Sequence, residues 1–293
     1  MPFGDSTEKG VTIRQPSTAN FLVDAKDGIQ AGGSASNFVI APPQSLLNGF
    51  FTRIGVPEMA LEWSEPNISP RYFNNAFDYD VSGYAVQNLT ILTGNYTVES
   101  ALIAFKNRLN DVSGAVGNLT WTLTGANGVA TLTPSSGTAQ VRFTGILASL
   151  LGLQPNAPFN YTQPGASVST NSFGSFQDLR PYRYIDFVSN ELTYNQNLKD
   201  ATTSRRLNRD VLVRWYFDWD EQPNLDGFGF PILMGYTAFR ARRQFNTPKQ
   251  IKWEPNMPIG QVSFQVYPDA GNINTPINMS SSLWGMTLQV SEV

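Results

Sequence analysis

The chain has 293 residues, enough to bury the core of one large β domain or two small ones, and its net charge is −3. Only 15% of the residues are charged, against about a quarter in ordinary soluble domains, which favours a neutral surface that neighbouring subunits cover. The absence of His and Cys excludes Ser/His/Asp and Cys/His catalytic centres, imidazole metal sites, disulfides and zinc thiolates, while the acidic balance disfavours a general nucleic-acid binder.

The first 36 residues have the composition of an arm. They are rich in Gly, Ser, Thr, Asp and Lys, with short apolar islands at residues 11–13 and 21–23, and they end in the linker-like sequence AGGS at residues 31–34. Two interpretations remain open: a disordered terminus, or an arm that becomes ordered on a neighbouring subunit. In both cases the folded domain is predicted to span residues 37–293.

Turn signals and short β-like runs follow the arm. Met59, Leu61 and Trp63 alternate with Ala60 and Glu62, which is the pattern of a strand. Residues 86–92 form another candidate strand.

A helix and a hairpin are predicted to form an excursion over residues 94–153. Thr97 is a suitable N-cap for a helix that continues to Asn110. The dipeptide Asn127-Gly128 predicts a tight turn between two strand-like runs. The apolar residues of the helix recur at helical spacing: Val98, Leu102, Phe105 and Leu109.

The clearest strands lie in the last third of the chain, at residues 211–219, 261–267 and 283–290. In each of them, every second residue is apolar, so the apolar side chains share one face of the predicted strand. Aromatic and β-branched strands joined by long irregular loops predict an all-β sandwich.

Two acidic motifs are candidates for chemistry. Asp218, Asp220 and Glu221 could act as paired carboxylates in glycoside hydrolysis, but a solvated strand end explains them better. Asp78 and Asp80 could contribute to a calcium site, but no DxDxDG spacing accompanies them. We therefore assign no catalytic, cofactor-binding or metal-binding residue.

Arginines gather at two places in the chain. Such clusters can bind phosphates, or they can pair with carboxylates across a subunit contact, where Arg is enriched. In an acidic chain we favour the subunit contact. The candidate interface residues are Arg205, Arg206, Arg209, Arg240, Arg242 and Arg243.

Several stretches after the arm carry a family resemblance. They lie at residues 45–55 (SLLNGFFTRIG), 61–69 (LEWSEPNIS), 94–110, 145–153 (GILASLLGL), 185–203, 245–267 and 283–292 (LWGMTLQVSE). These stretches resemble minor capsid, or penton, proteins of icosahedral double-stranded DNA viruses, the lineage of virophages, polinton-like viruses and nucleocytoplasmic large DNA viruses.

The resemblance implies a single jelly-roll β-sandwich with one embedded helix-and-hairpin excursion and a flexible N-terminal arm. It also implies a homopentamer that closes five-fold vertices and contacts a double-jelly-roll major capsid protein, while the arm contacts other minor capsid proteins. Such a subunit is not an enzyme, has no cofactor, binds no specific nucleic acid, and belongs to the virion, assembled in the infected host cell. No apolar run approaches the roughly 20 residues of a transmembrane segment.

Two other classes of function remain open from the residues alone. A jelly roll with exposed aromatic side chains could be a carbohydrate- or receptor-binding module. A glycosidase built on Asp218, Asp220 and Glu221 is the third possibility.

Overall fold

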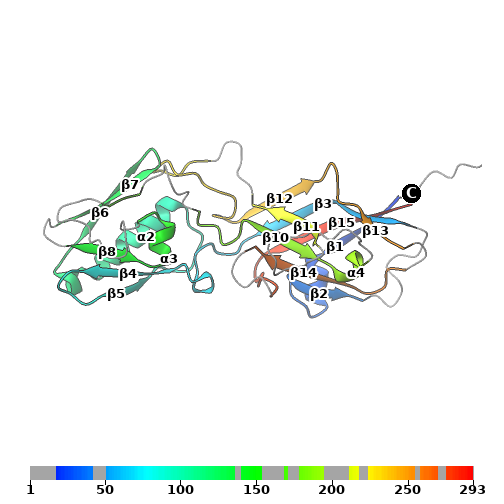
Figure 1. Ribbon diagram of the computed structural model, residues 1–293, viewed down its shortest axis with the longest axis horizontal. Helices are drawn as coiled ribbons and strands as arrows, with labels where there is room; N and C mark the ends of the chain where they lie inside the picture. Colours follow the sequence, from blue (N-terminus) through cyan, green and yellow to red (C-terminus); the bar gives the residue numbers. More distant parts are fainter. Residues whose placement is uncertain are drawn as a thin grey trace, which may run out of the picture.

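The computed structural model describes residues 18–41, 51–135, 140–153, 168–170, 178–194, 211–217, 224–254, 258–269 and 275–292. Figure 1 shows an elongated molecule with two lobes. The larger lobe, which we call the sandwich, contains both ends of the described chain. The smaller lobe, the insertion lobe, is built mainly from the middle of the chain.

The sandwich consists of two antiparallel sheets. Sheet A has the strand order β1 (Thr18–Asp24), β15 (Leu283–Ser291), β3 (Arg53–Trp63), β12 (Phe239–Gln244), and the short β13 (Ile251–Lys252) also pairs with β3. Sheet B has the order β11 (Val211–Tyr216), β10 (Tyr184–Val188), β14 (Val262–Pro268), β2 (Asn37–Ile40).

The pairing of these strands is nested. Apart from β13, the first sandwich strand pairs with the last, β1 with β15, and the next pairs inward are β2 with β14, β3 with β12 and β10 with β11. A long hairpin that wraps around a two-sheet core in this way is a jelly roll. The structure thus confirms the prediction of an all-β single jelly roll.

Alternating side chains from both sheets form the core of the sandwich. Along β14 and β15 every second side chain is buried, as the sequence predicts. The indole of Trp284 packs against the rings of Phe38, Phe187 and Phe264, with centroid distances between 5.0 and 5.7 Å. The buried side chains of β14 and β15 thus pack sheets A and B against each other, with aromatic rings at the contact.

One predicted alternation is only partly correct. In β11, Leu212 is buried and Val213 is half-buried, although the sequence pattern places Val213 on the buried face. The cause is a register shift between β10 and β11 near Phe187, which brings an extra residue into β11. The end of the predicted strand, residues 218 and 219, lies outside the described residues.

The predicted arm has to be shortened. Residues 18–36 contain β1, which pairs with β15 along its whole length, and the helix α1 (Ala25–Gln30). A Cβ atom at Gly28 would lie 2.1 Å from the Phe38 ring, and one at Gly33 would lie 2.6 Å from Phe38 Cβ. These glycines allow Phe38 to pack closely against the backbone. In the sequence alone, the same glycine-rich composition is typical of a flexible linker. Residues 1–17 lie outside the described chain.

The insertion lobe leaves the sandwich between β3 and β10. It contains a sheet of order β5 (Gln87–Thr90), β4 (Ala76–Val81), β8 (Val141–Thr144) and another of order β6 (Trp121–Ala126), β7 (Val129–Pro134), β9 (Val168–Thr170). The helices α2 (Val98–Asp111) and α3 (Ile146–Leu150) and the 3-10 turns η1 (Pro70–Tyr72) and η2 (Ser113–Val116) complete it, while the short α4 (Asn190–Thr193) belongs to the sandwich.

The predicted helix is the centre of this lobe. The Thr97 side chain accepts a hydrogen bond from the Ser100 backbone N–H, and the Ser100 side chain accepts one from Thr97 in a reciprocal capping box. The Phe105 ring stacks on Phe77 with a centroid distance of 4.0 Å. The lobe is larger than the predicted excursion over residues 94–153, because its core begins at Ile68 and also takes in residues 230–236.

A buried carboxylate holds the junction where the chain leaves β3. Glu65 is 2% exposed and accepts hydrogen bonds from the Ser281 backbone N–H and from the Ser282 hydroxyl, each at 3.1 Å. Its other oxygen lies 3.6 Å from Arg71 Nη1 in the insertion lobe. Glu65 thus links β3, the loop before β15 and the start of the insertion lobe.

Replacing Glu65 with alanine is expected to lower the free energy of unfolding by about 3 kcal/mol, because several buried donors lose a charged acceptor. Chemical denaturation of the purified chain measures the change. Glu62→Ala is the matched control, since this glutamate lies three residues away, is partly exposed and faces the more exposed Arg240. Equal losses from both substitutions would contradict the structural role of Glu65.

Candidate assembly surfaces

The structure describes one of the two predicted arginine clusters. Arg205, Arg206 and Arg209 lie outside the described residues. Arg240, Arg242 and Arg243 are on β12, the last strand of sheet A. Because side chains alternate along a strand, Arg240 and Arg242 share the outer face of the sheet, and Arg243 points to the other side.

The two outward arginines face two glutamates of β3. Arg242 donates two hydrogen bonds to Glu58, both at 2.6 Å, and it lowers the pKa of the Glu58 carboxyl. Arg240 Nε lies 3.6 Å from Glu62 Oε1. These pairs are solvent-exposed, so they contribute little to the stability of a single chain. They form a charged strip along the edge of sheet A.

Arg243 joins the two sheets at this edge. Its guanidinium lies 4.5 Å from the ring centroid of Trp215, which is on β11 in sheet B. The end strands β12 and β11 therefore lie on the same side of the sandwich. At the opposite side, β1 and β2 end the two sheets, with α1 between them. The two sides of the sandwich therefore carry different residues.

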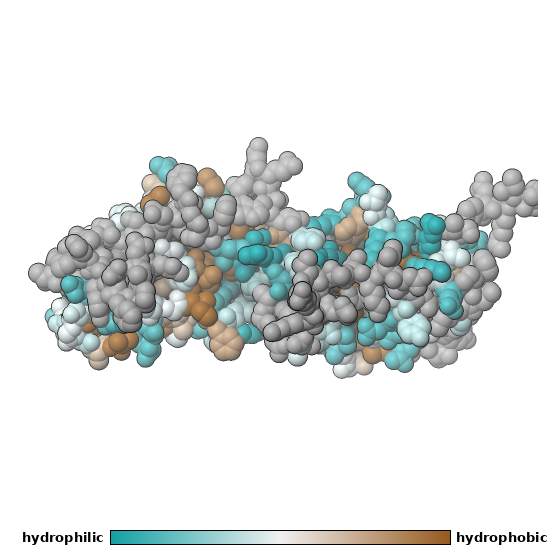
Figure 2. Space-filling view, in the orientation of Figure 1, coloured by the Kyte–Doolittle hydropathy of each residue, from teal (hydrophilic) through white to brown (hydrophobic). Residues whose placement is uncertain are grey.

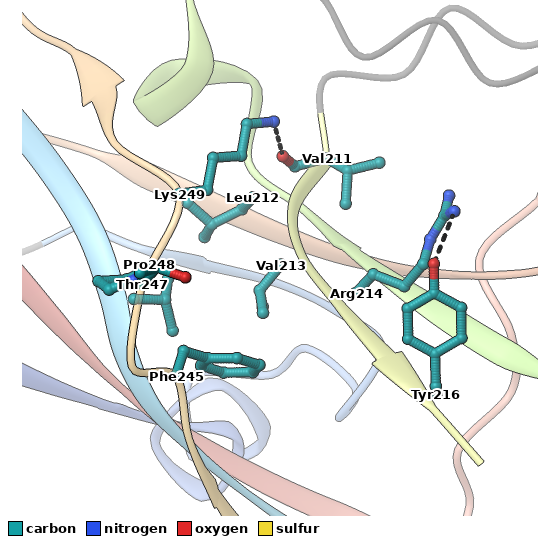
Figure 3. Close-up of a pocket in the computed structure, with 10 residues that line it drawn as sticks. Val211, Leu212, Val213, Arg214, Tyr216, Phe245, Thr247, Pro248 and Lys249 are labelled. Atoms are coloured by element: carbon teal, nitrogen blue, oxygen red, sulfur yellow. Dashed lines mark hydrogen bonds between the residues drawn. The ribbon is translucent and has the colours of Figure 1, made fainter. Parts of the chain in front are cut away.

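A hollow lies on the side formed by β11 and β12. It has a volume of about 320 Å³ and lies between β11 and the connection from β12 to β13. Figure 3 shows Leu212 and Val213 pointing from β11 toward Phe245 and Thr247. At one end the Lys249 ammonium donates to the Val211 carbonyl oxygen at 2.7 Å. We call this hollow the β11 groove.

The outer face of sheet B carries an arginine between tyrosines. Arg214 donates to both carboxylate oxygens of Asp186, at 2.6 and 2.9 Å, and its guanidinium lies 3.9 Å from the Tyr184 ring centroid. Tyr216, on the same face, is 44% exposed. Tyrosine and arginine are the residues that most often dominate binding at protein interfaces.

The candidate calcium ligands have other partners. Arg142 Nη2 donates to Asp80 Oδ2 at 2.7 Å, and Asp78 accepts from Asn88 Nδ2 at 2.5 Å and from the Thr144 hydroxyl at 3.2 Å. These bonds fasten β4 to its neighbours β5 and β8. Within the described ranges, no three acidic side chains gather in a way that suits a metal ion.

The other candidate carboxylates, Asp218, Asp220 and Glu221, lie outside the described residues.

A second hollow of about 470 Å³ lies at η1, between Tyr72, Phe73 and the loop that contains Ile277. Its lining among described residues has no carboxylate, and burial raises the pKa of Tyr72 far above its ordinary value.

The surface on the visible face is predominantly polar. Figure 2 shows hydrophobic residues in small groups, most plainly on the insertion lobe, with hydrophilic residues over much of the sandwich. No helix in the described part of the chain is long and apolar enough to cross a membrane. The sequence gives no signal for the β11 groove, since its lining comes from β11, the connection after β12 and Val56 of β3, which only the fold brings together.

Comparison with known proteins gives one informative result. No family model matches the chain, and no curated protein matches it. Among solved structures, the chain is similar to the crystal structure of the selenomethionine-labelled mavirus penton protein, with a TM-score of 0.56 and 10% identity. The match covers 96% of this chain and 100% of that one. The chain therefore has a penton-like fold, a single jelly roll that carries an insertion lobe.

Proposed function

We propose that this chain is a non-enzymatic structural subunit of an icosahedral double-stranded DNA virus, a penton protein that forms homopentamers at the five-fold vertices of the capsid. The observation that carries the proposal is the likeness to the mavirus penton protein over 96% of this chain and 100% of that chain. A partial match would support only a shared jelly roll, which many unrelated functions use. The match includes both lobes.

The difference between the two sides of the sandwich supports a ring. The side formed by β11 and β12 has an apolar groove and the charged strip of Arg240 and Arg242, whereas the side formed by β1 and β2 exposes Leu22 and Val39. Contacts between unlike sides are heterologous, and they generate closed rings when the rotation closes. The low charge content of 15% suits a surface that neighbours cover.

The proposed partners follow from the place of a penton in a shell. Each pentamer is surrounded by double-jelly-roll major capsid protein, and residues preceding β1 contact other shell proteins. The proposed location is the virion, after assembly in the infected host cell. No specific nucleic acid and no cofactor enter this proposal.

The first prediction is that the purified full-length chain forms rings of five. Native mass spectrometry should give about five times the 32.3 kDa mass of one chain, and electron micrographs should show five-fold symmetric particles. A protein that stays monomeric at high concentration and is absent from particle vertices would refute the proposal.

The second prediction concerns the outward arginines of β12. The double change Arg240→Glu and Arg242→Glu is expected to weaken association of the subunits by about tenfold or more, because it places four like charges on the strip with Glu58 and Glu62. Sedimentation at low salt measures the association.

The matched control for this prediction is Arg108→Glu, a charge reversal of a partly exposed arginine on α2, outside β12. Both variants should keep their fold, since Arg240 and Arg242 are exposed and Arg108 is partly exposed. Unchanged association of the β12 variant would show that this strip is not a subunit contact.

One observation favours a second candidate, a carbohydrate- or receptor-binding module. Tyr184 and Tyr216 lie side by side on sheet B, with ring centroids 5.6 Å apart, and such rings can stack on sugars. Glycan binding by a stable monomer that is lost on Tyr216→Ala would support the module over the penton.

A further inference from the structure

The outer edge of β11 can accept another strand. The Phe217 backbone N–H donates to the Arg183 carbonyl oxygen, and the register continues this pairing through Trp215 and Val213. Because backbone groups of an antiparallel strand alternate in direction, those of Arg214 and Tyr216 point away from β10. Beyond the register shift at Phe187, the Val211 carbonyl also points away from β10 and accepts the hydrogen bond from Lys249. Among described residues, β11 has no strand on that side. A free edge of this kind is a template for an added strand.

The β11 groove lies along this edge, and part of its lining is apolar. Val56 in this lining is buried, and Val213 and Phe245 are half-buried. Its volume of about 320 Å³ accommodates a few aliphatic side chains. The edge and the groove together suit a short extended segment whose alternate side chains are apolar.

A segment of this kind precedes the described chain. Residues 11–13 read Val-Thr-Ile. In an extended strand, the two β-branched apolar side chains of this sequence would share one side and Thr12 would lie on the other. The described chain begins at Thr18, in β1, an end strand of sheet A on the side opposite to the β11 groove. In the ring proposed above, the contact would bring these two unlike sides of neighbouring subunits together.

We propose that residues 11–13 of one copy add as a strand to β11 of the next copy, with Val11 and Ile13 in the β11 groove. This inference rests on the proposed function, since it needs a closed ring. The five residues from Ile13 to Thr18 span at most about 17 Å when extended, which is enough to cross a subunit contact. In the same subunit the segment would have to cross the three strand spacings of sheet A, about 14 Å, and then turn around its edge.

Cysteine crosslinking in a mixed assembly tests the proposal. The natural chain has no Cys, so each introduced thiol is unique. One batch carries Ile13→Cys, or Val11→Cys for the opposite strand direction, and the other carries Thr247→Cys on the exposed rim of the groove. The batches are dissociated, mixed, reassembled and treated with a short thiol-to-thiol crosslinker. A crosslink between the two batches can form only between subunits.

We expect covalent dimers from at least one of the two mixtures, and several-fold fewer when Thr12→Cys replaces the apolar position. Thr122→Cys, an exposed residue of the insertion lobe, measures random collision. Rings without crosslinks from either mixture would overturn the proposal. A chain that carries both thiols and forms a crosslink only within itself would overturn it as well.

Removing residues 1–17 gives an independent test. The variant keeps β1, and its ring dissociation constant should rise by about tenfold or more, because two aliphatic side chains per contact lose their burial. If the full-length chain forms no rings, the proposed function fails. If rings form and the truncation leaves their dissociation constant unchanged, the strand addition alone fails.

Discussion

Replacing Trp215 with alanine should lower the free energy of unfolding of the sandwich by about 3–5 kcal/mol. The indole is fully buried between the two sheets. Its Nε1–H has no hydrogen-bond partner in the described structure, so the substitution loses apolar burial and leaves a cavity without breaking a hydrogen bond of that group. Denaturation in urea, followed by circular dichroism, measures the loss.

The neighbouring residue provides the control. Tyr216 is 44% exposed on the outer face of sheet B, so Tyr216→Ala should have a much smaller effect than Trp215→Ala. If the two variants unfold at the same denaturant concentration, the assignment of inner and outer faces in β11 is wrong.

Replacing Phe105 with alanine should lower the free energy of unfolding of the insertion lobe by a similar amount, about 3–5 kcal/mol. Phe105 is fully buried on α2, and its ring contacts Phe77 at 4.0 Å and Phe143 at 5.3 Å between centroids. The matched control is Ile103→Ala, because Ile103 is on the same helix and is 38% exposed.

The two substitutions should act on different unfolding transitions. The buried residues form two separate clusters, one between sheets A and B and one around α2. Calorimetry of the Phe105→Ala variant is expected to show the insertion lobe unfolding at a lower temperature, with the sandwich transition nearly unchanged. A single transition that both substitutions shift equally would show that the two lobes unfold together.

Local features of this fold could be predicted from the sequence because their causes are local. The alternation in β14 and β15 and the capped helix α2 depend on residues within one element. Composition alone assigned residues 18–36 to an arm, although they fold into the sandwich. Gly28 and Gly33 look like linker residues, yet they allow Phe38 to pack against the backbone.

The candidate surfaces were predictable only in part. The cluster of Arg240, Arg242 and Arg243 is visible in the sequence, but strand alternation gives its members different roles. The β11 groove was not predictable, because its lining comes from β11, from the connection between β12 and β13, and from Val56 of β3, which only the fold brings together.

By itself, the sequence determined that this protein has no His- or Cys-based chemistry and that it contains amphipathic strands and one capped helix. Only the tertiary structure decided that the strands nest as a jelly roll, that residues 18–36 belong to it, and that residues 230–236 return to the core of the insertion lobe. The physical reason is that periodicity reports which face of an element is buried, whereas the partner of that face lies up to about 270 residues away in this chain.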